Sequence, residues 1–201
     1  MNVLSLFCFQ NIFYFAFREL RKMYYLCHMR KHNGMRPQDI AILIKIIAIG
    51  DSDWRLSDLS NSMFISLSEI SESLNRSRIA GLIDYNKDNV NRQNLIEFLE
   101  HGLKYVFPAE PGAMVKGIPT AHSHPFMKDH FESELNYVWR DPVGNFMGLV
   151  IEPFYLKQVE AIKIDAKFYK LLALIDVIRV GRVREQKIAI PELVRIMNYE
   201  Q

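Results

Sequence analysis

The sequence predicts a mainly α-helical protein with a small β ribbon. Apolar residues recur at helical spacing over residues 37–49, 66–80 and 166–180, whereas residues 137–151 contain two short runs typical of strands. Of the 201 residues, 49% are apolar and 24% are charged, the balance of a globular chain with a buried core. This composition excludes fibrous, disulfide-scaffold and wholly disordered proteins.

The net charge of +2 is unevenly distributed along the chain. Residues 1–36 carry +5, residues 37–107 carry −3 and residues 108–201 are neutral. No strong overall field therefore attracts nucleic acid, and a basic surface must come from the N-terminal arm or from local clusters. The two cysteines, Cys8 and Cys27, are too few for a disulfide framework and predict a reducing, cytoplasmic location.

Residues 1–35 form an apolar and basic extension ahead of the organised sequence. Of the 15 residues from 3 to 17, 12 are apolar and none is charged, which falls short of the roughly 18–20 residues of a membrane-spanning helix. Basic residues follow the run instead of preceding it, unlike a signal peptide. Three interpretations stay open: a membrane anchor, which its length disfavours, a helix packed on the body or on a second subunit, and a stretch upstream of the true start, for which Met23, Met29 and Met35 are candidates.

A central, buried helix is predicted next. Pro37 suits the first turn of a helix, and Asp39 complements its positive end. A wide apolar face then continues to Gly50, which is expected to end the helix. After a turn, Ser57 is expected to cap a short helix that runs to Met63.

The stretch from 57 to 83 is the most informative part of the sequence. Residues 64–66 form a predicted turn, and Ser66 with Glu69 makes a capping-box pattern that opens a second helix over 66–80. Leu67, Ile70 and Leu74 line one face of this helix, and polar residues occupy the other.

This arrangement resembles the helix-turn-helix of winged-helix transcriptional regulators of the MarR type. The resemblance spans residues 37–83 and rests on the first helix and on these segments: Asp58-Leu59-Ser60, Met63, Ile65-Ser66, Ile70-Ser71, Leu74-Asn75-Arg76 and Ala80-Gly81-Leu82-Ile83. Three positions differ from the family's pattern. Phe64 replaces the usual glycine of the turn, Glu72 replaces a basic residue that often meets phosphate, and Ser77 replaces a core leucine.

The resemblance implies a winged helix-turn-helix core over residues 36–107, with helix 66–80 entering the major groove of double-stranded DNA. It also implies a DNA-binding transcriptional regulator, and commonly a homodimer. The candidate DNA-binding residues are Ser66, Ser68, Ser71, Asn75, Arg76 and Arg78 in the second helix, and Lys87 and Arg92 in the wing. The alternative is an antitoxin-like winged helix that binds a protein partner and has no strong DNA affinity, since the second helix is neutral.

The rest of the chain is expected to support this core. Residues 84–94 form either a short wing or a plain loop, and a helix covers 94–107. Residues 108–136, rich in Pro and Gly, make an irregular connection. A β-hairpin and helices fill 137–201, with strands at 137–140 and 146–151 and helices at 154–164, 166–180 and about 191–199.

Two further groups contain residue types that can bind a metal or a phosphate. The pair His122 and His124, with His130, has no partner at a familiar metal-ligand spacing, so hydrogen-bonded loop histidines are expected. A basic patch between the last two helices could meet phosphate, an acidic partner or solvent: Arg179, Arg182, Arg184 and Lys187. The sequence contains no catalytic, phosphate-binding or dinucleotide motif, so we predict neither an enzyme nor a metal or cofactor.

Overall fold

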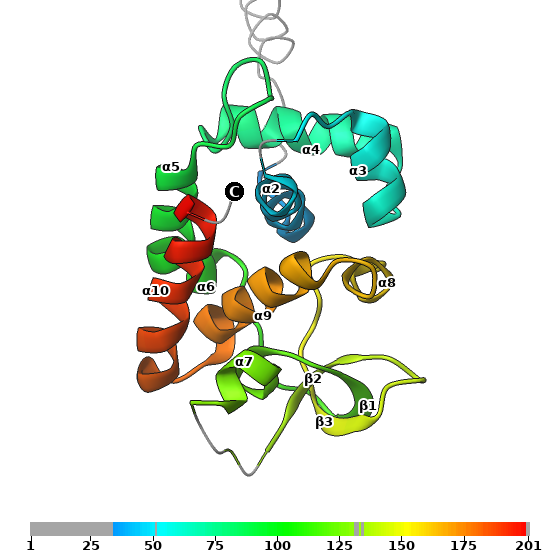
Figure 1. The fold of residues 1–201 in the computed structure, drawn as a ribbon, viewed down its shortest axis with the longest axis vertical. Coiled ribbons are helices and arrows are strands. Elements are labelled where there is room, and N and C mark those ends of the chain that lie inside the picture. The colour runs from blue at the N-terminus through cyan, green and yellow to red at the C-terminus, as the bar shows by residue number, and fades with distance from the viewer. Residues whose placement is uncertain (1–33, 51, 131–132, 134, 200–201) are drawn as a thin grey trace, which may run out of the picture. The chain divides into compact units, whose positions relative to one another are not determined.

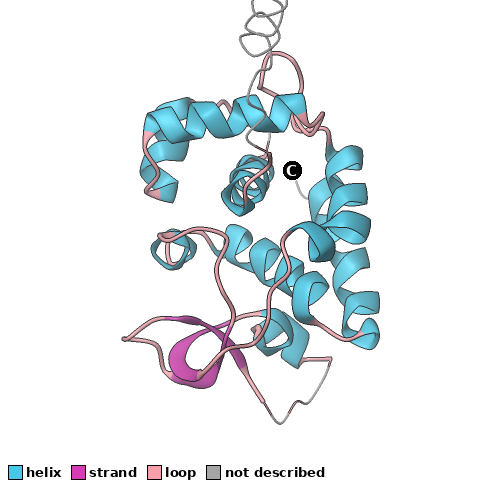
Figure 2. Cartoon of the chain, turned by 180° about the vertical axis from the view of Figure 1, so that it is seen from behind, coloured by secondary structure: helices cyan, strands magenta, loops and turns pink. Residues whose placement is uncertain are grey.

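The computed structural model describes residues 34–199 except 51, 131–132 and 134. Within them the chain is mainly α with a small β ribbon, as predicted (Figures 1 and 2). The interpretations offered for residues 1–33 lie outside the described residues. The elements in chain order are α2 Pro37–Ile49, α3 Leu56–Met63, α4 Leu67–Ile79, α5 Arg92–Glu97, the π-helical η1 Phe98–Gly102, α6 Leu103–Val106, β1 Met114–Pro119, the 3₁₀ turn η2 Ala121–Ser123, α7 Pro125–Lys128, β2 Tyr137–Arg140, β3 Phe146–Val150, α8 Gln158–Ile162, α9 Ala166–Val180 and α10 Val183–Tyr199.

Helix α2 forms the centre of the described part. It begins with Pro37, and the carboxylate of Asp39 accepts a hydrogen bond from the Arg36 N–H at 2.9 Å. It ends at Ile49, where the N–H of the following Gly50 donates to the carbonyls of Ile46 and Ile47, and the positive φ of Gly50, 75°, turns the chain out of the helix. In Figure 1 it is seen end-on, with α4 on one side and α9 on the other. The predicted central helix is therefore confirmed.

Helix α9 joins the C-terminal region to the same core. The ammonium of Lys45 in α2, which is buried, binds the carboxylate of Asp165 at 2.6 Å, and Asp165 also caps α9 by accepting from the Phe168 N–H. Apolar side chains from both sides of residues 108–136 form one buried cluster. Residues 35–201 consequently make one compact unit.

The predicted β-hairpin of residues 137–151 is wrong, although both strands exist. Strands β2 and β3 each pair antiparallel with β1, which lies in the expected irregular connection, and they meet each other in parallel. The glycine that suggested a loop has another role. A Cβ at Gly117 would lie 2.0 Å from the carbonyl oxygen of Trp139, so this glycine permits close backbone approach.

Helix boundaries also differ from the predicted ones. The helix expected at 94–107 begins at Arg92 and contains a π-helical turn. The last helix begins at Val183 and continues through Pro191, which was expected near its start. The basic patch therefore lies at the turn between α9 and α10, with Arg182, Arg184 and Lys187 exposed.

Candidate nucleic-acid interface

Helices α3 and α4 cross at a steep angle in Figure 1 and are joined by a tight turn. The Asp58 carboxylate caps α3 by accepting from the Arg55 N–H at 2.9 Å, so the predicted cap at Ser57 is wrong. In the turn, the Ser60 hydroxyl donates to the carbonyl of Ile65 at 2.6 Å. Phe64 adopts the left-handed conformation with φ 56°, at the place where the resemblance implies glycine.

Helix α4 begins where Ser66 caps it. The Ser66 hydroxyl accepts from the Glu69 N–H at 3.3 Å, which is one half of the predicted capping box. The carboxylate of Glu69 turns to other partners, namely Arg36 at 3.1 Å, Gln38 at 2.6 Å and Arg76 at 2.8 Å. These bonds tie the first turn of α4 to the start of α2.

Arg76 has an internal role, which disfavours the predicted contact of this residue with DNA. Its guanidinium donates to both carboxylate oxygens of Asp39, at 2.8 and 2.6 Å, and Asp39 is completely buried. Arg76 itself is 7% exposed. The bond to Asp39 raises the pKa of Arg76 above its usual range, while burial acts in the opposite direction. Its Nε and Nη2 groups donate to carboxylates and the side chain is buried, so it is poorly placed to reach a base or a phosphate.

The outward face of α4 carries the other predicted residues of the helix. Ser66 and Ser68 are exposed, and Ser71 and Asn75 are half-buried. Positions 68, 71 and 75 follow one another at helical spacing, so the structure brings them together on one side. This side also holds the exposed carboxylate of Glu72.

The predicted wing consists of one turn. A single antiparallel bridge joins Ile83 to Val90, and the carboxylate of Asp84 accepts from the N–H groups of Asp88 and Asn89. Burial by itself would raise the pKa of Asp84, but the hydrogen bonds that the turn donates to its carboxylate together lower it. Lys87 sits in the turn with a positive φ of 67° and is half-buried.

Arg78 and Arg92 lie on different sides of this turn. The guanidinium of Arg78 stacks on the ring of Tyr85, 5.5 Å from its centroid, which links the end of α4 to the turn. Arg92 is the first residue of α5, and it donates to the carbonyl of Met197 in α10. The bond to α10 directs this half-buried side chain to the C-terminal helix, so the predicted wing contact of Arg92 stays a prediction.

Two exposed apolar side chains flank the start of α4, and sequence reasoning missed them as surface features. Phe64 is 52% exposed and Leu67 is 53% exposed. Leu67 was expected on the buried face of the helix, but it is the first helical residue, and the interior face begins at Ile70. The resemblance could have flagged Phe64, since an aromatic ring in place of glycine has no room inside a tight turn.

The histidines of η2 and its neighbour are internal. His122 is bonded through Nε2 to the carbonyl of Leu135 at 2.7 Å, and His124 Nδ1 accepts from the Phe126 N–H at 3.2 Å. Burial, aided by the charge of Lys170, lowers the pKa of His124 to about 4. Across the described ranges, no three His, Cys, Asp or Glu side chains gather as metal ligands would.

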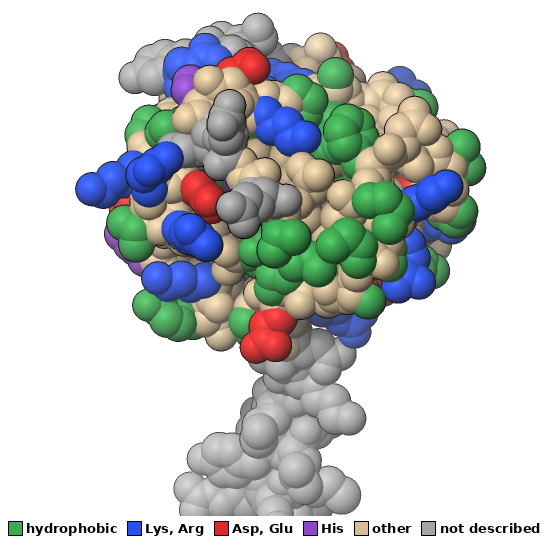
Figure 3. Space-filling view, turned by 90° about the horizontal axis from the view of Figure 1, so that it is seen from below, with side chains coloured by type: hydrophobic (Ala, Val, Ile, Leu, Met, Phe, Trp, Pro, Cys, Tyr) green, Lys and Arg blue, Asp and Glu red, His purple; other side chains and the backbone are tan. Residues whose placement is uncertain are grey.

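A face away from α4 is partly apolar. Figure 3 views the molecule from the side of the β ribbon, where hydrophobic side chains gather near the centre and Lys and Arg side chains toward the edges. The exposed apolar residues of the ribbon include Met114, Phe146 and Met147. The outward face of α4 differs from it because serine and asparagine dominate there.

Comparisons with protein-family models, with curated proteins and with solved structures found no significant match. None of the helices in the described part of the chain combines the length and the apolar character that crossing a bilayer requires. The candidate interface therefore rests on its own geometry.

Proposed function

We propose that the chain binds double-stranded DNA through the outward face of α4 and acts as a transcriptional regulator. One observation carries the proposal. The first turns of α4 present Ser66, Ser68, Ser71 and Asn75 outward, while the buried pair of Asp39 and Arg76 fixes the helix from behind. Hydroxyl and amide groups on an exposed helix can hydrogen-bond to base edges in a major groove.

The charge of this face determines what kind of DNA binding we expect. Within the described residues, Arg78 and Lys87 are the cations of α4 and its following turn that form no ion pair with a carboxylate, whereas Glu72 and Asp88 oppose them. Two phosphate contacts for each copy give a slope of about −2 for log affinity against log salt, or about −4 for a dimer. Base contacts would then supply the specificity, and phosphate contacts would supply only a modest part of the affinity.

The proposal includes a homodimer that uses two copies of α4. Two-fold symmetry would place the helices at half-sites about one DNA turn apart, as in other helix-turn-helix dimers. A palindromic site is the corresponding expectation for the DNA.

A second candidate function is binding of a protein partner by the same surface. The exposed side chains of Phe64 and Leu67 at the start of α4 favour this function, because exposed apolar residues next to a polar rim are typical of protein interfaces. The withdrawal of Arg76 and Arg92 into internal bonds favours it as well.

Binding to fragments selected from genomic DNA, followed by titration with the selected duplex, tests the proposal. We expect Asn75→Ala to weaken binding by about 1–3 kcal/mol, because one base-edge contact is lost. Asn198→Ala is the matched control, since Asn198 is exposed on α10. Equal affinities of both variants and the parent chain, or no duplex binding together with a stoichiometric protein complex on purification, would sink the DNA proposal.

A further inference from the structure

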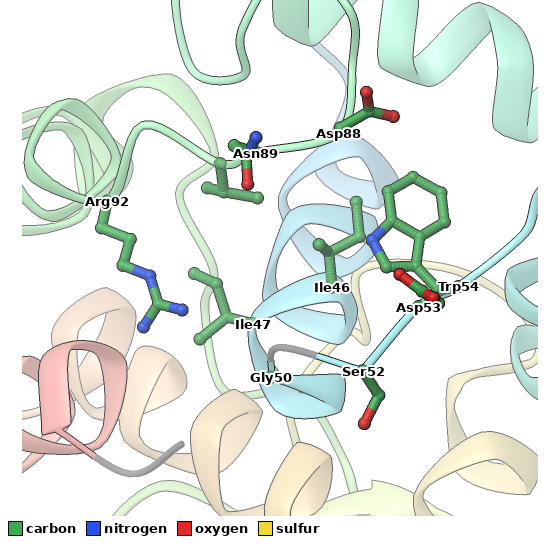
Figure 4. A pocket seen from close by; sticks show the side chains of 10 residues that line it. Ile46, Ile47, Gly50, Ser52, Asp53, Trp54, Asp88, Asn89 and Arg92 are labelled. Atoms are coloured by element: carbon green, nitrogen blue, oxygen red, sulfur yellow. The ribbon is translucent and has the colours of Figure 1, made fainter.

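A cavity of about 420 Å³ lies between the carboxyl end of α2 and the turn that follows α4 (Figure 4). Its volume falls within the range of small-molecule sites. None of its lining residues belongs to α4, so it is separate from the face proposed to bind DNA.

The floor of the cavity is apolar and fixed. Ile46 is 5% exposed and Ile47 is 2% exposed, and both belong to the last turns of α2. Trp54 stands beside them and is half-buried. Figure 4 shows the two isoleucines between the indole on one side and Arg92 on the other. The two isoleucines expose little surface, so the half-buried indole of Trp54 is the main apolar surface that a ligand of a few carbon atoms can cover.

The charge around the indole is negative. Asp53 and Asp88 line the cavity on the side of Trp54, and both are exposed. The carboxyl end of α2 adds to this sign, because unpaired helix carbonyls carry a partial negative charge and the last turn of α2 has no basic residue. Arg92 is on the opposite side, and its guanidinium already donates to Met197.

We propose that this cavity binds a small organic cation, an ammonium group on an apolar or aromatic body. The body packs against the indole of Trp54 above the buried floor of Ile46 and Ile47, and the ammonium lies near the indole and the carboxylates of Asp53 and Asp88. The aromatic face and the carboxylates attract the same charge. A ligand of the same shape without the positive charge keeps the apolar contact but loses the attraction to the aromatic face and to the two carboxylates.

Titration of the full chain with phenethylamine tests this, with phenethyl alcohol and phenylacetate as ligands of matched shape. The chain has two tryptophans, and Trp139 is completely buried, so Trp54 fluorescence reports occupancy. We expect a saturable change with the amine, binding at least about threefold weaker with the alcohol, and the weakest binding with the acid. No saturable change with the amine up to about 10 mM, or equal binding of the alcohol, overturns the proposal.

Three isosteric variants locate the site. Asp53→Asn and Asp88→Asn should each weaken amine binding by about two- to fivefold, as expected for partly exposed charge pairs. Asp129→Asn makes the same change at an exposed residue after α7 and should leave the affinity unchanged. Amine binding that none of the variants alters would place the amine elsewhere and refute the assignment. The readout is ligand occupancy, so the result does not depend on DNA binding.

Discussion

The buried ion pair of Asp39 and Arg76 determines how α4 is held. Asp39 is fully buried and has both carboxylate oxygens bonded to the same guanidinium, at 2.6 and 2.8 Å. A buried charge is tolerated only when its partner is present. Arg76, which the sequence predicts to contact DNA, therefore orients the helix instead. The neutral side chains beside it form the outward face.

Removing this partner should affect stability before it affects binding. We expect Arg76→Ala to lower the free energy of unfolding by about 3–5 kcal/mol, because Asp39 is left buried and uncompensated. Urea denaturation measures the change.

Arg78→Ala is the control for Arg76→Ala, since it removes the same side chain from the same helix. The Arg78→Ala variant loses one stacking contact with Tyr85, which should lower the free energy of unfolding by about 1 kcal/mol or less. Equal losses of stability in both variants would contradict the internal role of Arg76.

At the scale of elements, the sequence predicts helices well and their ends less well. The apolar faces of α2, α4 and α9 are long enough to determine their position, and Ser66 caps α4 as expected. Strand β1 escaped prediction because Gly117 and Pro119 are typical of loops, and only the pairing with β2 and β3 makes it a strand. That pairing is long-range, and local propensity does not contain it.

The candidate site shows the same limit at the level of side chains. Helical spacing predicted that Ser68, Ser71 and Asn75 share a face. It could not predict that Asp39, 37 residues away in sequence, forms an ion pair with Arg76. The direction of Arg92 toward α10 depends on the C-terminal fold in the same way.

The turn between α3 and α4 contains a strained residue that can be tested. Phe64 has a φ of 56°, which costs a residue with a Cβ about 1–2 kcal/mol. Phe64→Gly should therefore be more stable than Phe64→Ala by about 0.5–1 kcal/mol, after allowance for the greater freedom of glycine in the unfolded chain. Thermal or urea unfolding compares the two variants. An alanine variant as stable as the glycine variant would show that the turn is not strained.

At the scale of the whole molecule, residues 35–201 share one core. Helix α2 connects α4 on one side of this core with α9 on the other. It packs against α4 through Arg76 and against α9 through the Lys45–Asp165 pair. Unfolding of the β ribbon should consequently destabilise α4, because both contribute to one buried cluster. Cooperative unfolding is the expected behaviour.

The buried imidazole of His124 makes the stability of this unit depend on pH. Its pKa of about 4 in the folded chain lies below the usual 6.5, so the unfolded chain binds the proton more readily. Stability is then lost as the pH falls from about 6.5 toward 4. Unfolding at pH 5 should require about 2 kcal/mol less than at pH 8 on account of this group.

His124→Asn provides the comparison, since an amide oxygen can accept from the Phe126 N–H as Nδ1 does and does not titrate. Denaturant titrations of both chains at several pH values measure the effect. We expect a flatter pH dependence in the variant between pH 6.5 and 5. A variant with an unchanged slope in that interval would assign the acid sensitivity to other groups.

Backbone amide NMR of the chain during titration with a selected duplex addresses the central claim directly. The account predicts that the largest shifts fall on Ser66, Ser68, Ser71 and Asn75, with smaller ones at the turn of Lys87. Shifts concentrated at the α9–α10 turn or on the β ribbon, with α4 unaffected, would contradict it.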